Sequence, residues 1–364
     1  MAPPPAALLL VVLLLVGFEA LPTKSGYLPI PTANASLFFA YYEATHPLTP
    51  PASTPIILWL QGGPGCSGLT GNFFELGPYF VNHDALSLSP NPFAWNRRFG
   101  LLFIDNPLGT GFSAAPSPAA IPTNQFVVAA HLFTALQSFF ALQPGFRSRP
   151  FFLTGESYAG KYVPAAGSYI LAVNPTLPKR LRVNLHGVAI DNGLTHPVAQ
   201  VATHADTAYF MGLINAKQRR ELEALQARAV ELTNAASDTV GAAMHGDVMK
   251  SVKPGVEALL RGTRVLLYQG IRDLRDSVVS TEAWMRELKW DGLTAFLVAD
   301  RAVWRIGEEL AGYVQRSGPL SHVVVYGAGH LVPADNGRVA QEMIEDWVLQ
   351  AGLFGRHGGM KRAA

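Results

Sequence analysis

The sequence predicts an α/β fold with a mostly parallel central sheet flanked by helices. Short apolar runs of strand length recur, and clusters of Gly, Pro and Asn separate them. These runs cover residues 37–42, 56–60, 101–104, 151–153, 185–190, 265–268 and 323–326. Helix-length segments lie between several of them. Strands that are apolar on both faces and alternate with helices are typical of a parallel sheet covered on both sides.

Three segments carry the helical pattern. Apolar residues recur at intervals of three and four across residues 127–140, and Pro144 with its following glycine ends the pattern. A second helix is expected in residues 161–171, established once the chain is past Pro164. In residues 341–349 the apolar side chains fall on one face, which suits a final helix packed on the sheet.

Composition bounds the class of protein. Of the 364 residues, 49% are hydrophobic and 15% charged, which indicates an ordered fold with a large core. We expect one domain over residues 21–354. Residues 215–254 are rich in Ala, Arg and Glu and carry no strand-like run, so they are expected to leave the sheet as a helical cap. The basic tail, residues 355–364, is expected to be disordered. The net charge of +2, without a basic stripe of interleaved aromatics, argues against a nucleic-acid partner.

The N-terminus predicts export. An apolar run over residues 6–16 is too short to span a membrane, and small or turn-prone residues follow it, so residues 1–20 are expected to be a signal peptide. No later stretch reaches about 18 apolar residues, so no membrane association is expected after its removal. Asn34-Ala35-Ser36 is a glycosylation sequon, which is usable only in a secreted protein. The oligomeric state stays open.

The stretch richest in chemical information is Gly155-Glu156-Ser157-Tyr158-Ala159-Gly160. A buried strand precedes it and a helix follows it, which is the context of a nucleophile elbow. The serine of such an elbow sits on a tight turn and projects above the sheet. Because a serine hydroxyl alone is a poor nucleophile, the chain must also supply a histidine and an acid that orients it.

An acid and a histidine follow later strands in the order expected for this architecture. Asp273 comes a few residues after the strand at 265–268, and His330 follows the strand at 323–326 through a Gly-rich loop. Both would reach the edge of the sheet where the elbow lies. Asp276 is the rival acid, three residues further along. Alternatively, Asp273 is a solvated loop carboxylate and His330 caps a turn.

Acyl chemistry also requires donors for a tetrahedral oxyanion. Gly62-Gly63-Pro64-Gly65 directly follows the strand at 56–60, and the backbone N–H groups of such a loop can approach an oxyanion closely. By itself the glycine loop is more often only a turn.

Four segments together resemble the motifs of the serine carboxypeptidase family. They are Trp-Leu-Gln-Gly-Gly-Pro-Gly-Cys-Ser at 59–67, Phe-Glu-Leu-Gly-Pro at 74–78, Ile-Asp-Asn-Pro-Leu-Gly-Thr-Gly-Phe-Ser at 104–113, and the elbow at 155–160. Residues 21–29 and 268–284 are especially similar to the plant serine carboxypeptidase-like 50 group. The resemblance implies an α/β-hydrolase fold and removal of C-terminal residues from peptide substrates at acidic pH, in the secretory pathway, outside the cell or in the vacuole. Neither a cofactor nor a metal is expected.

The resemblance also implies roles for individual residues. The triad would be Ser157, Asp273 and His330, and the N–H groups of Gly63 and Tyr158 would form the oxyanion hole. The terminal carboxylate of the substrate would be bound by Gln61, Glu75 and Glu156. Two close carboxyl groups cannot both ionise cheaply, so one would keep a proton and donate a hydrogen bond to that carboxylate. The alternative is that the two glutamates are separate structural carboxylates.

The chain departs from the family pattern at several positions. Gln61 stands where Asn is common, His196 where Asp is common, and Asp191 replaces a usual Gly, which is costly if that position needs a positive φ. The span between Ser157 and Asp273 is also short. The resemblance implies that a family insertion, which shapes the pocket and holds a disulfide partner, is shortened around residues 240–247.

That cut leaves Cys66 as the only cysteine of the chain. A lone cysteine is most often a small buried hydrophobic residue. Two other functions stay open: an acyltransferase that takes acyl groups from sugar esters, and a secreted form whose catalysis is impaired by the short insertion.

Overall fold

The computed structural model describes residues 21–239 and 247–355. The predicted signal peptide, most of the expected deletion point (residues 240–246) and the tail from residue 356 lie outside the described residues.

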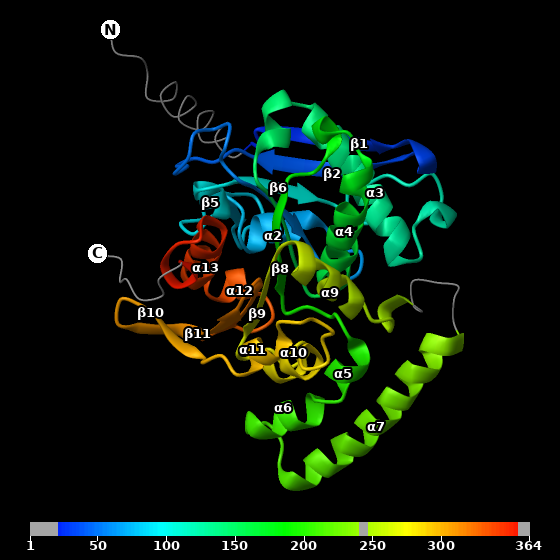
Figure 1. The fold of residues 1–364 in the computed structure, drawn as a ribbon, viewed down its shortest axis with the longest axis vertical. Coiled ribbons are helices and arrows are strands. Elements are labelled where there is room, and N and C mark those ends of the chain that lie inside the picture. The colour runs from blue at the N-terminus through cyan, green and yellow to red at the C-terminus, as the bar shows by residue number, and fades with distance from the viewer. Residues whose placement is uncertain (1–20, 240–246, 356–364) are drawn as a thin grey trace.

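A single large sheet organises the chain. Its strands are β1 (Lys24–Ile30), β2 (Ala35–Tyr42), β3 (Ile56–Leu60), β6 (Gly100–Ile104), β7 (Phe151–Glu156), β8 (Leu185–Asp191), β9 (Arg264–Gly270), β10 (Ala302–Ile306), β11 (Glu309–Ser317) and β12 (Leu320–Val325). They lie in the order β1-β2-β6-β3-β7-β8-β9-β12-β11-β10 (Figure 1). The central strands run parallel to one another; they are β6, β3, β7, β8, β9 and β12. The outer strands pair antiparallel, β1 and β2 on one side and β11 and β10 on the other. The predicted mostly parallel sheet is confirmed.

All seven predicted strands are present, but the sequence did not predict the outer ones. β1 and β10 alternate between exposed and buried positions, so neither forms a continuous apolar run. β11 mixes buried and partly exposed positions, and a small separate pair, β4 (Tyr79–Val81) with β5 (Leu88–Pro90), has only three residues in each strand. These strands are stabilised by pairing and by one covered face rather than by burial on both sides.

Helices cover both faces of the sheet. They are α2 (Gly68–Phe74), α3 (Gln125–Ala141), α4 (Ala159–Val173), α5 (Pro197–Val201), α6 (His204–Phe210), α7 (Ala216–Thr239), α9 (Lys253–Gly262), α10 (Val278–Met285), α11 (Leu293–Leu297), α12 (Val332–Asp335) and α13 (Gly337–Leu349). Short 3₁₀ turns are η1 (Pro31–Ala33), η2 (Trp95–Arg97), η3 (Pro118–Ala120), η4 (Pro144–Ser148), η5 (Asn174–Thr176), η6 (Lys179–Leu181) and η7 (Gly352–Phe354). None of the helices among the described residues is long and apolar enough to cross a membrane.

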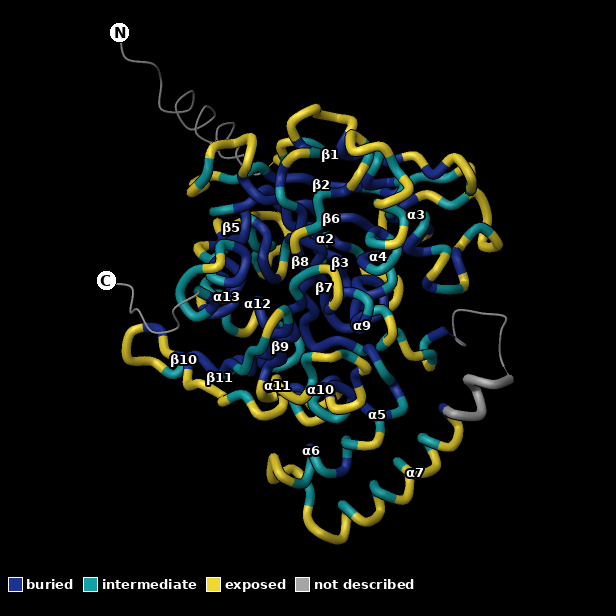
Figure 2. Tube along the Cα trace, in the orientation of Figure 1, coloured by how far each residue is buried: buried dark blue, intermediate teal, exposed yellow. Residues whose placement is uncertain are grey.

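Strand β3 illustrates how the two layers are built. Ile56, Leu58 and Leu60 pack with apolar residues of α3, α4 and α9, whereas Ile57 and Trp59 pack with those of α13 on the other face. Figure 2 shows the sheet strands as the buried centre of the molecule. Because alternate side chains of every central strand enter one of two cores, the strands are held rigidly, and loops at their ends inherit fixed positions.

The helix after the elbow differs from its prediction. Pro164 lies inside α4, which already begins at Ala159. A proline in this position cannot donate to the carbonyl of Gly160. The hydroxyl of Thr195 donates to that carbonyl instead, at 3.2 Å. The expectation that the helix is established only beyond Pro164 was therefore wrong, because a side chain from after β8 replaces the missing donor.

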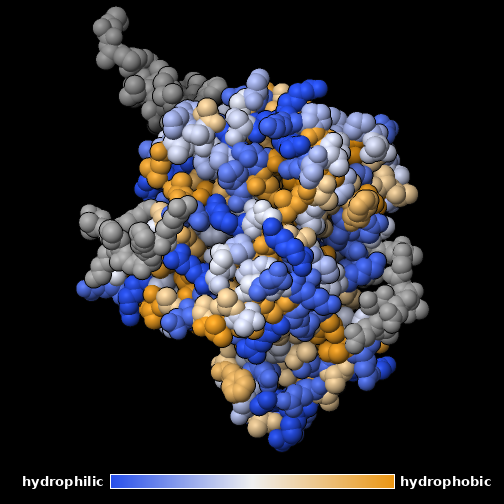
Figure 3. All heavy atoms as spheres, viewed as in Figure 1, coloured by the Kyte–Doolittle hydropathy of each residue, from blue (hydrophilic) through white to orange (hydrophobic). Residues whose placement is uncertain are grey.

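Between β8 and β9 the chain leaves the sheet as a helical excursion, and no strand is described within it. Its two ends meet, because the Val252 amide donates to the Thr195 carbonyl at 3.0 Å. Helix α7 contacts α5 and α6 and extends away from the sheet (Figure 1). Helix α7 and the turn before it expose both charged and apolar side chains (Figure 3), Leu213 and Leu225 among the latter. At the other end of the molecule, Asn34 is exposed beside η1.

Candidate active site

Ser157 occupies a strained turn between β7 and α4. Its φ is 61°, a left-handed conformation that is unusual for a residue with a side chain. The glycines on either side permit the turn: a Cβ at Gly155 would lie 2.5 Å from the Leu60 carbonyl oxygen, and one at Gly160 2.7 Å from the Gly193 Cα. The strand, the tight turn and the helix have the geometry of a nucleophile elbow.

Asp273 and His330 lie together at the edge of the sheet that the carboxyl ends of its parallel strands form. Asp273 follows β9 and His330 follows β12, and His330 Nδ1 is 2.7 Å from Asp273 Oδ2. The other carboxylate oxygen of Asp273 accepts a hydrogen bond from the backbone N–H of Arg275 at 2.9 Å. Ser157 lies at this edge too, but its hydroxyl makes no hydrogen bond to another described residue. Catalytic contacts of this kind often tighten only when substrate binds.

The pKa of His330 is raised although the ring is largely buried. Burial disfavours the charged imidazolium, but the hydrogen bond to Asp273 and its negative charge outweigh this, with a further contribution from Asp276. The imidazole is therefore well prepared to take a proton from a neighbouring hydroxyl. Asp276, the rival acid, makes no hydrogen bond to His330 within the described chain, so Asp273 is the one of the two that binds the imidazole.

Asn192 connects the loops of the site, a role that no local sequence pattern indicates. Its side-chain N–H groups donate to the carbonyls of Gly329 and His330 at 2.9 and 2.8 Å. Its side-chain oxygen accepts the Gly270 N–H at 3.2 Å. The next residue back, Asp191, accepts the Ser157 N–H through its carbonyl at 2.9 Å. The end of β8 thus holds the serine, acid and histidine loops at once.

The glycine loop after β3 lies against the elbow. Gly63 has a φ of 106°, and a Cβ on Gly62 would lie 2.6 Å from the Tyr158 nitrogen. The N–H groups of Gly63 and Tyr158 make no hydrogen bond to another described residue. Helix α4 begins immediately after Tyr158, so its dipole adds positive potential here. Both donors are free for an anionic oxygen.

Gln61, Glu75 and Glu156 form one buried polar cluster. The Gln61 side-chain N–H groups donate to Glu75 Oε1 at 3.0 Å and to Glu156 Oε1 at 2.8 Å. The orientation of the amide is fixed by Trp59, whose indole N–H donates to Gln61 Oε1 at 2.9 Å. Since Glu156 directly precedes Ser157, the cluster adjoins this serine. The two glutamates are not separate, because one amide bridges them.

The charge state of this cluster follows from its burial. Both glutamates are 1% exposed, and desolvation is the main reason why their pKa values are raised. The pKa of Glu156 is raised well above its ordinary value, because the charges of Glu75 and Asp191 add to the cost of ionising it. The pair therefore retains a proton at pH values where an exposed glutamate has lost it.

Asp191 does not need a glycine's conformation. It ends strand β8, and the positive φ of 40° belongs to the next residue, Asn192. The predicted conformational cost at Asp191 was therefore wrong. The side chain is fully buried between Glu156 and Tyr268 in the strand register. Burial, and then the charges of Glu75 and Asp273, raise its pKa well above the ordinary value.

Two further residues that the sequence singled out are Cys66 and His196. Cys66 is exposed, so the expectation of a buried hydrophobic residue was wrong. His196 Nε2 is 3.1 Å from Glu287 Oε2, where it joins the start of the excursion to the loop after α10.

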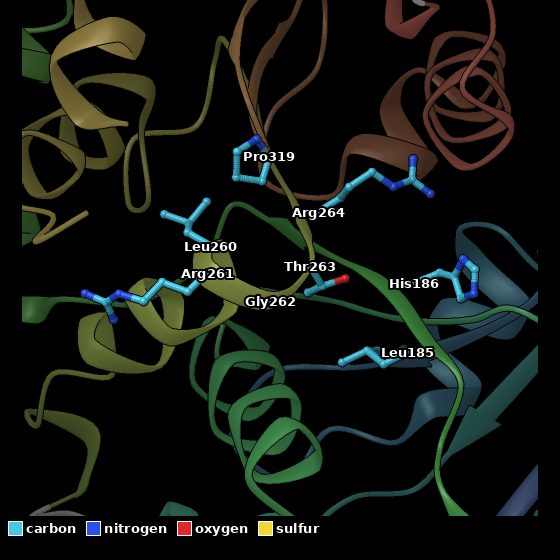
Figure 4. Close-up of a pocket in the computed structure, with 8 residues that line it drawn as sticks. All are labelled: Leu185, His186, Leu260, Arg261, Gly262, Thr263, Arg264 and Pro319. Atoms are coloured by element: carbon cyan, nitrogen blue, oxygen red, sulfur yellow. The ribbon is translucent and has the colours of Figure 1, made fainter. Parts of the chain in front are cut away.

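A separate hollow lies at the amino ends of the parallel strands, on the side of the sheet opposite Ser157. It has a volume of about 430 Å³ and is shallow, between the end of α9 and the starts of β8 and β9 (Figure 4). Arg264, Arg261 and Leu185 line it. Ligands of open α/β sheets bind at the carboxyl ends of the strands, where Ser157 lies, so this hollow is not the reaction site.

A strained serine turn, a histidine–carboxylate pair and a parallel sheet define a serine hydrolase of the α/β-hydrolase class. Within that class, the chain belongs to the serine carboxypeptidase family, whose profile matches residues 17–239 and 224–350. It is therefore a hydrolase of the peptidase type.

Relatives support this membership. The chain is 49% identical to serine carboxypeptidase-like 50 of Arabidopsis thaliana, over 93% of this chain and 90% of the relative. It is 32% identical to the venom serine carboxypeptidase of Apis mellifera, over 92% and 86%. A prohormone-processing carboxypeptidase from Saccharomyces cerevisiae superposes with a TM-score of 0.76 at 22% identity, covering 90% and 91% of the two chains. This superposition confirms the predicted α/β-hydrolase fold.

Proposed function

We propose that the chain removes C-terminal residues from peptides through a Ser157–His330–Asp273 triad and that it does so at acidic pH. The observation that carries this proposal is the buried, proton-retaining carboxyl pair directly beside the elbow serine. A general esterase has no need of such a pair, whereas a carboxypeptidase must recognise a free carboxylate.

The arrangement supports a two-step acyl transfer. Ser157 Oγ attacks the carbon of the last peptide bond while His330 accepts its proton, and Asp273 stabilises the resulting imidazolium. The N–H groups of Gly63 and Tyr158 donate to the oxyanion. The imidazolium then protonates the departing amine, and the acyl group stays on Ser157. Water, deprotonated by the same imidazole, releases the shortened peptide and restores the hydroxyl.

Recognition of the terminal carboxylate falls to the cluster of Gln61, Glu75 and Glu156. A protonated glutamate donates a hydrogen bond to the carboxylate, and the Gln61 amide holds the two glutamates together. When the pair loses its proton, like charges face each other and the carboxylate of the substrate. Binding should therefore weaken as pH rises.

An acidic compartment of the secretory pathway, or the extracellular space, would suit this chemistry. The predicted signal peptide over residues 1–20 supports export. The exposed position of Asn34, in its sequon, leaves room for a glycan.

The cap sets the level of activity in this proposal. The two family matches meet within residues 224–239, and the alignment to the Arabidopsis relative spans 402 positions, more than the 364 residues of this chain. Both findings support a shortened insertion, and the overlap of the two matches lies next to residues 240–247, where we expect it. The cleft would then be more open than in relatives with the full insertion, and Cys66 would keep a free thiol.

The test compares three substrates with purified protein. A blocked dipeptide with a free C-terminus, the same dipeptide amidated, and an acyl-glucose with an alcohol acceptor would be assayed from pH 4 to 7.5. Release of the C-terminal residue from the free acid, fastest at acidic pH, is the expected result. Acyl transfer without hydrolysis would establish the acyltransferase instead, and inertness toward all three would establish the impaired form.

A further inference from the structure

A second buried carboxylate lies beside the histidine–aspartate pair. Asp276, in the loop after β9, is 1% exposed. One of its carboxylate oxygens, one of Asp273 and one ring nitrogen of His330 all lie within 4.8 Å of one another. The proposed mechanism uses Asp273 and His330 but assigns nothing to Asp276.

Gln200, on α5, fixes one oxygen of this carboxylate. Its side-chain N–H groups donate to Asp276 Oδ1 and to the Gly193 carbonyl, both at 3.0 Å. Its side-chain oxygen accepts hydrogen bonds from the backbone N–H groups of Thr195 and His196, both at 2.8 Å. The Gln200 amide thus uses all its hydrogen-bonding groups and cannot rotate without losing several of them. One oxygen of Asp276 is thus held by an amide whose own orientation is fixed.

The second oxygen of Asp276 is not committed. Within the described chain it makes no hydrogen bond, and the nearest cation, Arg275 Nε, is 3.6 Å away on a side chain that is 58% exposed. Lys161 of α4 also faces Asp276 but donates to the Lys250 carbonyl. Arg275 and Lys161, together with Asp273 and His330, are the charged or titratable groups that act on Asp276. Neither cation forms a hydrogen-bonded ion pair with it.

An uncommitted oxygen alone does not assign a role, because buried Asp191 and Asp247 also have carboxylate oxygens without a hydrogen bond among the described residues. The position of Asp276 beside His330 distinguishes it from them. Here one oxygen is satisfied by a neutral amide and the other stays uncommitted beside the group that gains a positive charge during the reaction.

We propose that Asp276 is a second positioning carboxylate for His330. This inference rests on the function proposed above. Asp276 stabilises the imidazolium through space while Asp273 holds its Nδ1–H, and it becomes the main anionic partner of the imidazole when the charge of Asp273 is removed. No proton moves to Asp276 in the reaction cycle; it acts only through its charge on His330.

The effect should depend on pH. Burial, and then the charge of Asp273, raise the pKa of Asp276 to about 6. The carboxyl gains its charge as pH rises through about 6, so Asp276 stabilises the imidazolium near and above that pH and contributes little in more acidic solution. An ionised Asp276 raises the pKa of His330, so the two groups titrate as a coupled pair. On the acid side of the pH profile, the rise of kcat/KM with pH should therefore report the titrations of both Asp276 and His330.

The experiment uses the full secreted chain with four variants: Asp276→Asn, Asp273→Asn, the double variant, and Asp247→Asn as control. An asparagine at 276 keeps an oxygen that can accept the Gln200 N–H. Asp247 is buried and acts on Lys161, as Asp276 does, but is not among the groups that shift the pKa of His330. For each, kcat/KM on a blocked dipeptide would be measured from pH 3.5 to 7.5.

In Asp276→Asn we expect the midpoint of the acid limb to fall by roughly 0.5 pH unit, because a charge next to the imidazole is lost. We expect the double variant to be at least about tenfold less active than Asp273→Asn, because no carboxylate then faces His330. Asp247→Asn should leave the midpoint in place.

An unchanged midpoint in Asp276→Asn, or a double variant as active as Asp273→Asn, would overturn the inference. If Asp276→Asn does not fold, Asp276→Ser removes the same charge with less bulk and gives the same readout. Failure of the proposed function is a separate result, because wild-type protein would then not hydrolyse the dipeptide at all.

Discussion

The side-chain amide of Asn192 donates a hydrogen bond to the backbone carbonyl of His330 at 2.8 Å. Strand β8 supplies none of the proposed triad, yet it lies between the strand that leads to Ser157 and the strand that leads to Asp273. A polar residue at its end is therefore the natural place from which to hold all three loops. The buried Asn192 side chain holds the loops of Asp273 and His330, and the carbonyl of the neighbouring Asp191 holds the Ser157 N–H.

Asn192→Ala should lower both stability and activity. It leaves the Gly329 and His330 carbonyls and the Gly270 N–H without their partner, which should cost about 1–3 kcal/mol in the free energy of unfolding. A small displacement of the histidine loop should reduce kcat/KM by roughly 10–100-fold. Asn184→Ala, at the opposite end of β8, removes a hydrogen bond to the Ser148 carbonyl and serves as control. Equal kcat/KM losses in the two variants would contradict a positioning role.

A fluorophosphonate probe should label Ser157. The Ser157 hydroxyl makes no hydrogen bond to another described residue, and His330 would accept its proton. Ser157→Ala should abolish labelling, and His330→Ala should slow it by orders of magnitude. Mass spectrometry of the labelled peptide checks the site. Persistent labelling of Ser157→Ala would remove this residue from the mechanism.

KM should rise with pH for peptides with a free C-terminus and stay nearly constant for amidated ones. The raised pKa values of Glu75 and Glu156 keep a proton on the pair at acidic pH, and that proton is lost as pH rises. Glu75→Gln should flatten the profile, because an amide donates at any pH. Glu287→Gln, which alters an exposed carboxylate, should leave the profile unchanged. Parallel profiles for the two peptide classes would exclude the pair from carboxylate recognition.

The pH dependence of stability should differ in sign between two buried-site variants. Asp191 has a raised pKa, so the native state binds more protons than the unfolded state above the ordinary aspartate pKa, and stability is lost as pH rises. Asp191→Asn should therefore gain stability relative to wild type between pH 4 and 7. Burial lowers the pKa of His322 to about 4. Here the unfolded state binds more protons between about 4 and 6.5, so His322→Gln should lose its relative advantage as pH rises.

Thermal unfolding of the three proteins at half-unit pH steps checks this prediction. Opposite slopes of the two Tm differences are expected. Slopes of the same sign would mean that the pH dependence arises elsewhere, for example from the unfolded ensemble.

Restoring the insertion should strengthen the enzyme. Grafting the corresponding segment of a full-length relative between residues 240 and 247 should raise activity, because a closed cleft excludes water from the oxyanion site. If the graft also brings a cysteine that pairs with Cys66, stability should rise by roughly 2–5 kcal/mol. Thiol titration, thermal unfolding and kcat/KM are the measurements. No gain from the graft would show that the short cap does not limit the protein.

The sequence predicted the central strands because they are apolar on both faces, and it predicted Ser157, Asp273 and His330 because each follows such a strand. The pairing of Glu75 with Glu156 came only from the family resemblance, since residues so far apart in the chain carry no local signal of contact. Asn192 and Asp276 could not be assigned from the sequence, because their importance depends on which loops the fold brings within hydrogen-bonding distance.

The errors have the same origin. Pro164 reads locally as a helix breaker, but Thr195 supplies the donor that its ring removes. Asp191 reads as a misplaced substitute for glycine, but the left-handed residue is its neighbour. In each case a contact or a one-residue offset, visible only in three dimensions, decided the outcome.

The hydrogen bond between Val252 and Thr195 closes the neck of the excursion. Once a loop is closed at its base, doubling its length costs only about 0.6 kcal/mol of additional entropy. The segment beyond α5 can therefore lengthen or shorten during evolution without shifting the strands that carry the reactive groups. Selection can thus alter which molecules are admitted to the sheet edge independently of the reaction performed there.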